Sequence, residues 1–498
     1  MIPFTAEQIA EVCGAALLAG EPACTSTDDV PARAVVDSRD VHEGDLFVGL
    51  PGENVDGGEF AAKAAGAGAW GVLVRTQHAQ AVAASNSEAT RVFGVDDPLA
   101  ALGLLARARV DGLRAAGCKV LAITGSTGKT STKDILSALL APHFDGAVHA
   151  SPRNYNTEIG LPLTVLAAEE GTRALVLEMA MRGPGQIKEL CDIAHPEIGV
   201  ITNVGPVHLE LLGTVEAVAE AKAELIRALP TSGVCVVPAF AEALRPHLRS
   251  DIRTLTFASW PEDGNGPIEA AGRVAQAAAD LRVIAAAPAD VDGQRGLRAE
   301  IAIGAERSAF EFNFRQTHNL VNALAAIGAG HAAGVPMESL AQGARQVTFS
   351  ELRGEEVELP GGAVVVNDCY NANPISMRAA LDYLADLAAE RQAPRAVAVL
   401  GEMAELGPAG PEFHREIGAY AAARSVKLLV AVGDLGDEYV RGFGGTGDTH
   451  RAANAAEAAA LVSGLIEPGD AVLLKGSRSV GLESVAAALQ DTAERDGR

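Results

Sequence analysis

A glycine-rich turn between an apolar run and a helix-forming run constrains this chain more than any other feature. Residues 119–132 read KVLAITGSTGKTST, so the apolar run 120–123 leads into a turn that ends in Gly-Lys-Thr. Gly125 and Gly128 let backbone N–H groups converge on phosphate oxygens, and the N-terminus of the following helix adds its positive dipole end. Lys129 can then reach the β- and γ-phosphates, and the Thr130 hydroxyl can bind Mg²⁺. The stretch therefore predicts a site for ATP or GTP.

The loop is shorter than the strict pattern G-x-x-x-x-G-K-[ST], because Ile123 stands where that pattern has its first glycine. We assign Ser126, Thr127 and Ser131 to the same phosphate-binding turn. The alternative is a glycine-rich turn that precedes Lys-Thr without binding phosphate. The strand and the helix on either side of the turn favour phosphate binding.

Length and charge limit the other possibilities. A chain of 498 residues exceeds one hydrophobic core and indicates about three domains. The net charge of -24 argues against nucleic acid as a partner. No run approaches the ~20 apolar residues of a membrane-spanning helix, and the start lacks a signal-peptide pattern, so we expect a cytoplasmic protein without membrane insertion. The six scattered cysteines show no C-x-x-C spacing, which suggests neither a zinc site nor disulfides.

Strand and helix patterns divide the chain into three segments, which we predict as domains over 1–97, 98–334 and 335–498. The first mixes short strands with an Ala-rich helix, and the other two alternate strands with helices. The fold class is therefore α/β, with a mixed N-terminal domain, a central parallel-sheet P-loop domain and a C-terminal Rossmann-like domain.

Particular elements follow from the same patterns. A helix is predicted over 99–116, a strand-rich excursion over 261–311 and a surface loop over 441–448. The predicted strands cover 45–50, 71–75, 120–124, 174–179, 198–203, 234–237, 364–367, 396–400, 428–432 and 471–474.

Polar residues stand at the C-terminal ends of the central strands, where a parallel sheet binds its ligands. Glu178 would be poorly solvated there unless it met a cation such as Mg²⁺, although it could instead cap the following turn. His208 follows another strand and is either structural or functional. Lys222 lies in a helix whose charges would ordinarily be solvated.

Two further groups suggest that a second domain closes over the nucleotide. Asn319 and Asn322 lie one helical turn apart, so their amides share a face and can contact an adenine edge. N-capping of the helix by Asn319 is an equally good account. The segments 367–374 (NDCYNANP) and 474–479 (LKGSRS) are turn-forming and follow strands of the C-terminal unit.

The chain resembles the Mur ligases, the ATP-dependent amide ligases of peptidoglycan precursor synthesis. The resemblance covers nearly the whole chain and rests on ITGSTGKTS, NYNTEIGLPLTVL, LEMAMRGPGQI, ITNVGPVHLELLG, AKAEL, HNLVNALAA, DCYNANPISM, LGEMAELG and LKGSR. The segment DSRDVHEGDLFVGLPGENVDG is similar to the uridine-nucleotide domain of the tripeptide-forming and the D-Ala-D-Ala-adding members. DCYNANP, GEMAELG and KGSRS resemble the D-Ala-D-Ala-adding members, whereas the motifs of the tripeptide-forming members are absent.

This resemblance implies the reaction of ATP, UDP-MurNAc-tripeptide and D-Ala-D-Ala to give UDP-MurNAc-pentapeptide, ADP and phosphate through an acyl phosphate. It also implies two Mg²⁺ ions, with Thr130 and Glu178 holding the first and His208 and a carbamylated Lys222 the second. The catalytic residues would be Lys129, His208 and Lys222. The implied contacts are Gly125 to Ser131, Arg353, Asp368 and Lys475 for ATP with Asn319 and Asn322 at adenine, Ser38 and Arg39 for the uridine nucleotide, and Asn154, Arg182 and Asn371 for the rest of the substrate.

Two alternatives remain at this point. A nucleotide-gated scaffold without catalysis would be favoured if Lys129, Glu178, His208 or Lys222 were missing, and all four are present. The other alternative is a sister Mur ligase that adds the third amino acid to UDP-MurNAc-dipeptide. In either enzyme we expect a monomer.

Overall fold

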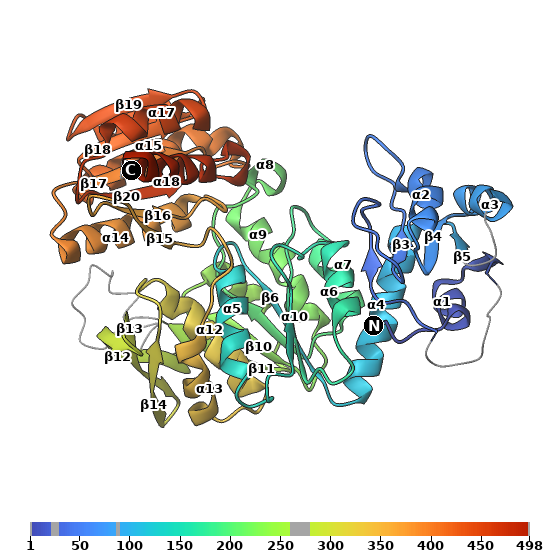
Figure 1. The fold of residues 1–498 in the computed structure, drawn as a ribbon. Coiled ribbons are helices and arrows are strands. Elements are labelled where there is room, and N and C mark those ends of the chain that lie inside the picture. The colour runs from blue at the N-terminus through green and yellow to red at the C-terminus, as the bar shows by residue number, and fades with distance from the viewer. Residues whose placement is uncertain (1, 21–28, 86–89, 259–278, 497–498) are drawn as a thin grey trace.

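Three units follow one another along the chain in the computed structural model (Figure 1). The structure describes residues 2–20, 29–85, 90–258 and 279–496. The central unit lies between the N-terminal unit, drawn in blue, and the C-terminal unit, drawn in orange and red (Figure 1). Within the described residues, no helix is both long and apolar enough to cross a lipid bilayer.

The N-terminal unit contains a five-stranded sheet in the order β1-β5-β4-β3-β2, in which only β1 runs antiparallel to its neighbour. The strands predicted over 45–50 and 71–75 are confirmed as β3 and β4. The elements are α1 (Ala6–Cys13), β1 (Ala16–Ala19), β2 (Ala34–Val35), β3 (Leu46–Val48), α2 (Ala61–Gly66), β4 (Gly71–Arg75), α3 (Thr76–Ser85) and β5 (Arg91–Val95).

The helix α4 (Pro98–Ala115) connects this unit to the next. Asp97 caps it, since its carboxylate accepts hydrogen bonds from the backbone N–H groups of Leu99 and Ala100 at 2.9 and 3.2 Å. Proline at the first helical position needs no hydrogen-bond partner and fits this start. The helix predicted over 99–116 is thereby confirmed, whereas the domain boundaries remain predictions.

The central unit is built on a nine-stranded sheet in the order β14-β13-β12-β11-β10-β9-β6-β8-β7. The strands from β7 to β12 are parallel, and β12, β13 and β14 are antiparallel. Its strands are β6 (Lys119–Thr124), β7 (Val148–Ala150), β8 (Ala174–Glu178), β9 (Ile198–Ile201), β10 (Val234–Pro238), β11 (Arg253–Ala258), β12 (Leu281–Val291), β13 (Gln294–Ile303) and β14 (Glu306–Phe312).

The four strands predicted for this unit at 120–124, 174–179, 198–203 and 234–237 are confirmed as β6, β8, β9 and β10. The described part of the predicted 261–311 excursion forms the three antiparallel strands β12 to β14, while residues 261–278 lie outside the described residues. The unit's helices are α5 (Lys129–Leu140), α6 (Gly160–Ala167), α7 (Gln186–Ala194), α8 (Leu209–Leu212), α9 (Val215–Lys222), α10 (Glu224–Ala228), α12 (Asn319–Ala332) and α13 (Met337–Gly343).

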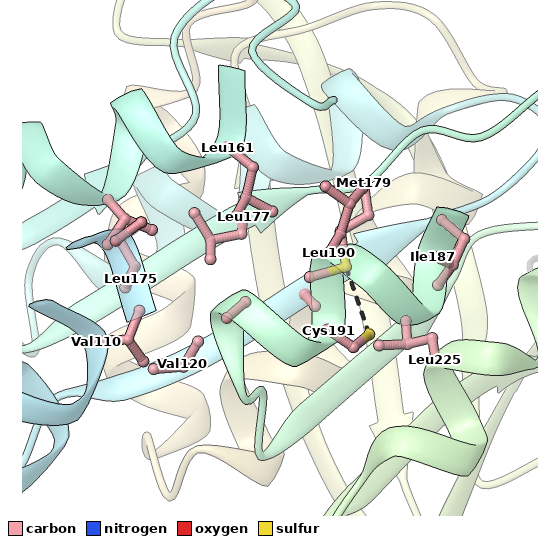
Figure 2. Packing of buried hydrophobic residues seen from close by; sticks show 14 of the residues in the cluster. Val110, Val120, Leu161, Leu175, Leu177, Met179, Ile187, Leu190, Cys191 and Leu225 are labelled. Carbon is pink, nitrogen blue, oxygen red and sulfur yellow. Dashed lines mark hydrogen bonds between the residues drawn. The ribbon is translucent and has the colours of Figure 1, made fainter. Parts of the chain in front are cut away.

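Helices cover both faces of this sheet, because the strands of a parallel sheet are buried on both sides. Leu175 and Leu177 of β8 belong to a core cluster that includes residues of α4, α6 and α7. Val176, which points to the opposite face, belongs to a cluster that includes residues of α5 and α12. Figure 2 shows the first of these clusters, in which the Cys191 Sγ lies 3.7 Å from the Met179 Sδ.

The C-terminal unit is a six-stranded sheet in the order β15-β16-β20-β17-β18-β19, parallel except for β15. The four strands predicted for this unit are confirmed as β16, β17, β18 and β20. The elements are β15 (Glu355–Glu358), β16 (Val364–Asn367), α14 (Pro374–Arg391), β17 (Ala396–Gly401), α15 (Gly410–Ala423), β18 (Leu428–Val432), α16 (Gly436–Phe443), β19 (Asp448–Ala452), α17 (Ala455–Leu465), β20 (Ala471–Lys475) and α18 (Glu483–Asp496).

The prediction of a surface loop over 441–448 is wrong at both ends. The helix α16 continues to Phe443, and Asp448 begins the strand β19. β19 lies at the edge of the sheet and is mostly half-buried, so its sequence DTHRA lacks the apolar run that identifies a central strand.

Candidate active site

The phosphate loop joins β6 to α5 and depends on two glycines. Gly125 has φ +154° and Gly128 has φ +77°, which are unfavourable for other residues. A Cβ atom on Gly125 would lie 1.9 Å from the Thr202 Oγ1, and one on Gly128 would lie 2.2 Å from the Asn322 Oδ1. Close approach of neighbouring side chains therefore requires glycine at both positions.

The segment that follows β9 holds the loop in place. The Ser126 Oγ donates a hydrogen bond to the carbonyl oxygen of Gly205 at 3.2 Å and accepts one from the Gly205 N–H at 3.0 Å. The Thr127 N–H donates to the Asn203 Oδ1 at 2.8 Å, and the Asn203 amide also contacts the Thr127 hydroxyl. Asn203 was not among the predicted site residues, although its place at a strand end could have indicated it.

Lys129 begins α5 and turns back over the loop. Its Nζ donates to the carbonyl oxygen of Gly125 at 2.9 Å. Burial lowers the pKa of the Lys129 ammonium, and the Glu178 carboxylate partly opposes this shift. The ammonium therefore lies where anionic phosphate oxygens would restore its usual pKa.

Glu178 ends β8 and is 2% exposed. Its Oε1 accepts a hydrogen bond from the Asn156 Nδ2 at 2.7 Å, whereas its Oε2 is buried without a partner. Among the described residues, its carboxylate accepts no hydrogen bond from the following turn, which speaks against the capping alternative. A buried carboxylate oxygen without a partner next to a phosphate loop fits a bound cation.

His208 precedes α8 with a positive φ of +53°. Its Nδ1 contacts the Glu405 Oε2 from the C-terminal unit. Burial lowers the pKa of the His208 imidazole, while Glu405 opposes the shift. Glu405 was not predicted as a site residue.

Lys222 ends α9 and is 2% exposed. In the described parts of the chain its ammonium makes neither a hydrogen bond nor an ion pair. Burial, and then the charge of Lys129, lowers the pKa of Lys222 well below its usual value. The alternative of a solvated helix lysine does not fit this burial.

Asn319 and Asn322 lie at the start of α12 and contact each other. The Asn322 Nδ2 donates to the Asn319 Oδ1 at 2.9 Å. The residue at the N-cap position is His318, so Asn319 does not cap the helix. The Asn322 Oδ1 also lies 3.5 Å from the Thr132 Oγ1, which places this amide pair against the phosphate-loop helix.

Two cationic side chains after α13, Arg353 and Lys475, line the same cavity as the loop. The Arg353 Nη2 donates to the Thr130 Oγ1 at 3.2 Å, and its guanidinium lies 4.0 Å from the ring centroid of Tyr370. The Lys475 Nζ lies 2.6 Å from the Asp368 Oδ2. Lys475 is 1% exposed, so the Asp368 carboxylate compensates a buried charge.

A cavity of about 1510 Å³ lies between the central and C-terminal units. The predicted site residues that line it are Ser126, Thr127, Gly128, Lys129, Thr130, Ser131, Asn154, Glu178, Arg182, His208, Asn319, Asn322, Arg353, Asp368, Asn371 and Lys475. Residues that were not predicted also line it, among them Asn156, Asn203, Tyr370 and Glu405.

Four predicted residues are not among the cavity-lining residues. Gly125 forms the base of the loop. Besides burial, the charge of Lys129 lowers the pKa of Lys222, and the charge of Lys222 lowers the pKa of His208. Ser38 and Arg39 belong to the N-terminal unit. Arg39 has an 80% exposed side chain that pairs with Asp37 at 2.5 Å.

The protein side chains alone do not complete a metal site. Among the described residues, no three His, Cys, Asp or Glu side chains form a group that could hold a metal ion. Mg²⁺ commonly binds through one or two carboxylates together with phosphate oxygens and water. Thr130 and the unpartnered oxygen of Glu178 fit that kind of shared site.

The loop, the buried carboxylate and the cations from two α/β units define a P-loop nucleotide-binding protein whose site lies between domains. Three family models match the chain: Mur ligase family, catalytic domain over 35–110, Mur ligase middle domain over 123–330, and Mur ligase, glutamate ligase domain over 352–478. The chain belongs to the Mur ligase family.

Relatives match it from end to end. The UDP-N-acetylmuramoyl-tripeptide--D-alanyl-D-alanine ligase of Mycobacterium tuberculosis is 36% identical over 519 residues and covers 98% of each chain. The Bacillus subtilis enzyme of the same name is 32% identical, over 97% of this chain and 98% of the relative.

Solved structures agree with this fold. MurF from Acinetobacter baumannii superposes with a TM-score of 0.79 at 25% identity, covering 98% of this chain and 99% of that one. MurF ligase from Thermotoga maritima, solved in complex with ADP, gives a TM-score of 0.74 at 27% identity, covering 94% and 99%. The predicted three-domain α/β architecture is thereby confirmed.

Proposed function

We propose that this protein joins D-Ala-D-Ala to UDP-MurNAc-tripeptide and converts ATP to ADP and phosphate in the same reaction. The observation that carries the proposal is the full-length similarity to enzymes named for this reaction, at 36% identity over 98% of the chain. The phosphate loop and the cavity supply the nucleotide site that such an enzyme needs. The rival reaction, addition of a single third amino acid, has no support among these names.

The reaction proceeds in two steps. A carboxylate oxygen of the tripeptide attacks the γ-phosphorus of ATP, the bond between the β,γ-bridging oxygen and that phosphorus breaks, and ADP leaves. The amine of D-Ala-D-Ala then attacks the acyl carbon and loses a proton, and phosphate leaves as the amide forms. Both steps concentrate negative charge in one site, so positioned cations are needed to stabilise it.

Different site residues bind the different parts of the substrates. Lys129 and the backbone N–H groups of the loop bind the β- and γ-phosphates, and Arg353, which donates a hydrogen bond to Thr130, binds phosphate oxygens beside it. Asn319 and Asn322 contact adenine, and Asp368 and Lys475 contact the ribose and phosphates. Asn154, Arg182 and Asn371 face the muramoyl peptide and the dipeptide, and Ser38 and Arg39 bind the uridine nucleotide from the N-terminal unit.

Two Mg²⁺ ions fit this arrangement, with Thr130 and Glu178 at the first and His208 and a modified Lys222 at the second. When bound, they would offset the charge of the phosphates and of the acyl phosphate. An unmodified ammonium at Lys222 would repel such an ion.

Carbamylation of Lys222 removes that repulsion. The neutral amine, which the lowered pKa favours, attacks CO₂ to form an N–C bond and releases one proton, so that the group becomes an anion. Nuclear magnetic resonance with ¹³CO₂ tests this without turnover. A carbamate signal is expected in the wild-type protein and none in Lys222→Met, and a wild-type spectrum without the signal would reject the modification.

Phosphate release decides the reaction. Purified protein, ATP and UDP-MurNAc-tripeptide are assayed with D-Ala-D-Ala or with single amino acids as the acceptor. We expect release with the dipeptide only. Release that requires UDP-MurNAc-dipeptide and a single amino acid would identify the sister ligase instead.

A further inference from the structure

Glu405 of the C-terminal unit contacts the central unit through both its side chain and its backbone. It follows β17, and its Oε2 contacts the His208 Nδ1 while its Oε1 lies 3.5 Å from the Arg182 Nε. Its backbone carbonyl oxygen accepts a hydrogen bond from the Glu210 N–H at 3.3 Å. Glu405 and the two side chains that meet its carboxylate, His208 and Arg182, line the cavity.

The backbones on both sides of this contact are unusual. Glu405 has φ +62° and His208 has φ +53°, a region that residues other than glycine rarely occupy. Gly407 packs against α8 so closely that a Cβ there would lie 3.2 Å from the Glu210 Cα. Such conformations persist when the surrounding structure holds them, and they cluster at functional sites.

The contact with His208 has a chemical consequence. A carboxylate only accepts hydrogen bonds, so the imidazole nitrogen that faces it must carry the hydrogen. In the neutral imidazole the other nitrogen, Nε2, then keeps its lone pair. The Arg182 side chain is 74% exposed, so its contact with Glu405 is the weaker of the two.

We propose that Glu405 is a positioning residue that selects the tautomer of His208 when the C-terminal unit is seated on α8. Glu405 accepts the Nδ1–H hydrogen bond across the domain interface and leaves Nε2 able to bind a cation or a hydrogen-bond donor. The contact that brings the C-terminal unit against α8 therefore also sets the tautomer of His208. The catalytic consequence rests on the proposed function, whereas the tautomer does not.

The tautomer is measured on the full-length protein labelled with ¹⁵N histidine, in the absence of metal and nucleotide. Long-range ¹H–¹⁵N correlation spectra distinguish the two tautomers, and His208→Gln identifies the His208 signals among the 11 histidines. The wild-type protein should show hydrogen on Nδ1. Glu405→Ala and Glu405→Leu, which cannot accept the bond, should both shift the population toward hydrogen on Nε2, while Glu405→Gln should keep the wild-type tautomer.

Kinetics test the consequence for the reaction. Loss of a hydrogen-bond partner that orients a metal-binding histidine costs about 10–100-fold in activity. We expect kcat of Glu405→Ala to fall by at least about tenfold, with a much smaller change in KM for ATP, and Glu405→Gln to restore most of it. Glu412→Ala, at an exposed carboxylate at the start of α15, is the matched control and should leave both the spectrum and kcat unchanged.

The two proposals fail in different ways. An unchanged His208 tautomer in both Glu405→Ala and Glu405→Leu would overturn the positioning role, whatever happens to activity. A changed tautomer in a protein whose wild type releases no phosphate with D-Ala-D-Ala would support the positioning role and reject the proposed reaction.

Discussion

Lys222→Met is expected to abolish activity and at the same time to raise the free energy of unfolding. The lysine is 2% exposed, and within the described residues its ammonium has no hydrogen-bond or ion-pair partner. At pH 7 such a lysine is either an uncompensated buried charge, which costs about 3–5 kcal/mol, or a neutral amine that has given up its proton at a similar cost. Methionine is unbranched and of similar size but carries no charge. We therefore expect the variant to be more stable than the wild type by about 3 kcal/mol at pH 7.

This gain should depend on pH in a defined direction. Burial lowers the pKa of Lys222 in the folded state, so the folded protein binds fewer protons than the unfolded chain between the folded-state pKa and about 10.4. The contribution of Lys222 to the stability of the wild type is lowest below the folded-state pKa. It becomes less unfavourable as the pH rises toward about 10.4. The advantage of Lys222→Met should shrink over the same range.

Urea unfolding at several pH values, together with phosphate release, measures both effects. The unfolding buffers are kept free of CO₂, because a carbamate would remove the buried cation before unfolding begins, whereas phosphate release is assayed with bicarbonate present. Lys63→Met, at an exposed lysine of α2, is the control and should change neither quantity appreciably. Turnover of Lys222→Met at the wild-type rate would refute the reasoning. So would a difference in unfolding free energy between variant and wild type that does not vary with pH.

Three further substitutions test the loop, the connection to the C-terminal unit and the core. Gly128→Ala should weaken ATP binding by about tenfold or more in calorimetry, because its φ is +77° and its Cβ would lie 2.2 Å from the Asn322 Oδ1; unchanged affinity would contradict this. Asp134→Ala should lower the free energy of unfolding by about 1–3 kcal/mol, because the Ser350 N–H loses its acceptor at 2.8 Å; a neutral result would show that water replaces the acceptor. Leu177→Ala, at a fully buried side chain in Figure 2, should cost about 2–5 kcal/mol in urea unfolding, and a loss below 1 kcal/mol would indicate that the core collapses around the site.

Local sequence determined the phosphate loop and most of the central strands. The turn from β6 to α5 is specified within a few residues, since Gly125 and Gly128 supply the backbone conformations and Lys129 and Thr130 supply the ligands. Strands such as β8 are buried on both faces, so an apolar run identifies them without knowledge of their neighbours. The edge strand β19 has no such run and was missed.

Only the tertiary structure decided how distant segments meet. Lys222 carries no sign of burial in its own helix, and its environment comes from packing that brings it near the charges of Lys129 and His208. The contact between Glu405 and His208 joins residues 197 positions apart. Neither segment contains a sequence pattern that indicates which residue it will contact. Periodicity and turn chemistry act over a few residues, whereas contacts between domains depend on how complete sheets and helices pack against one another, which is why the loop could be read from the sequence and the interface could not.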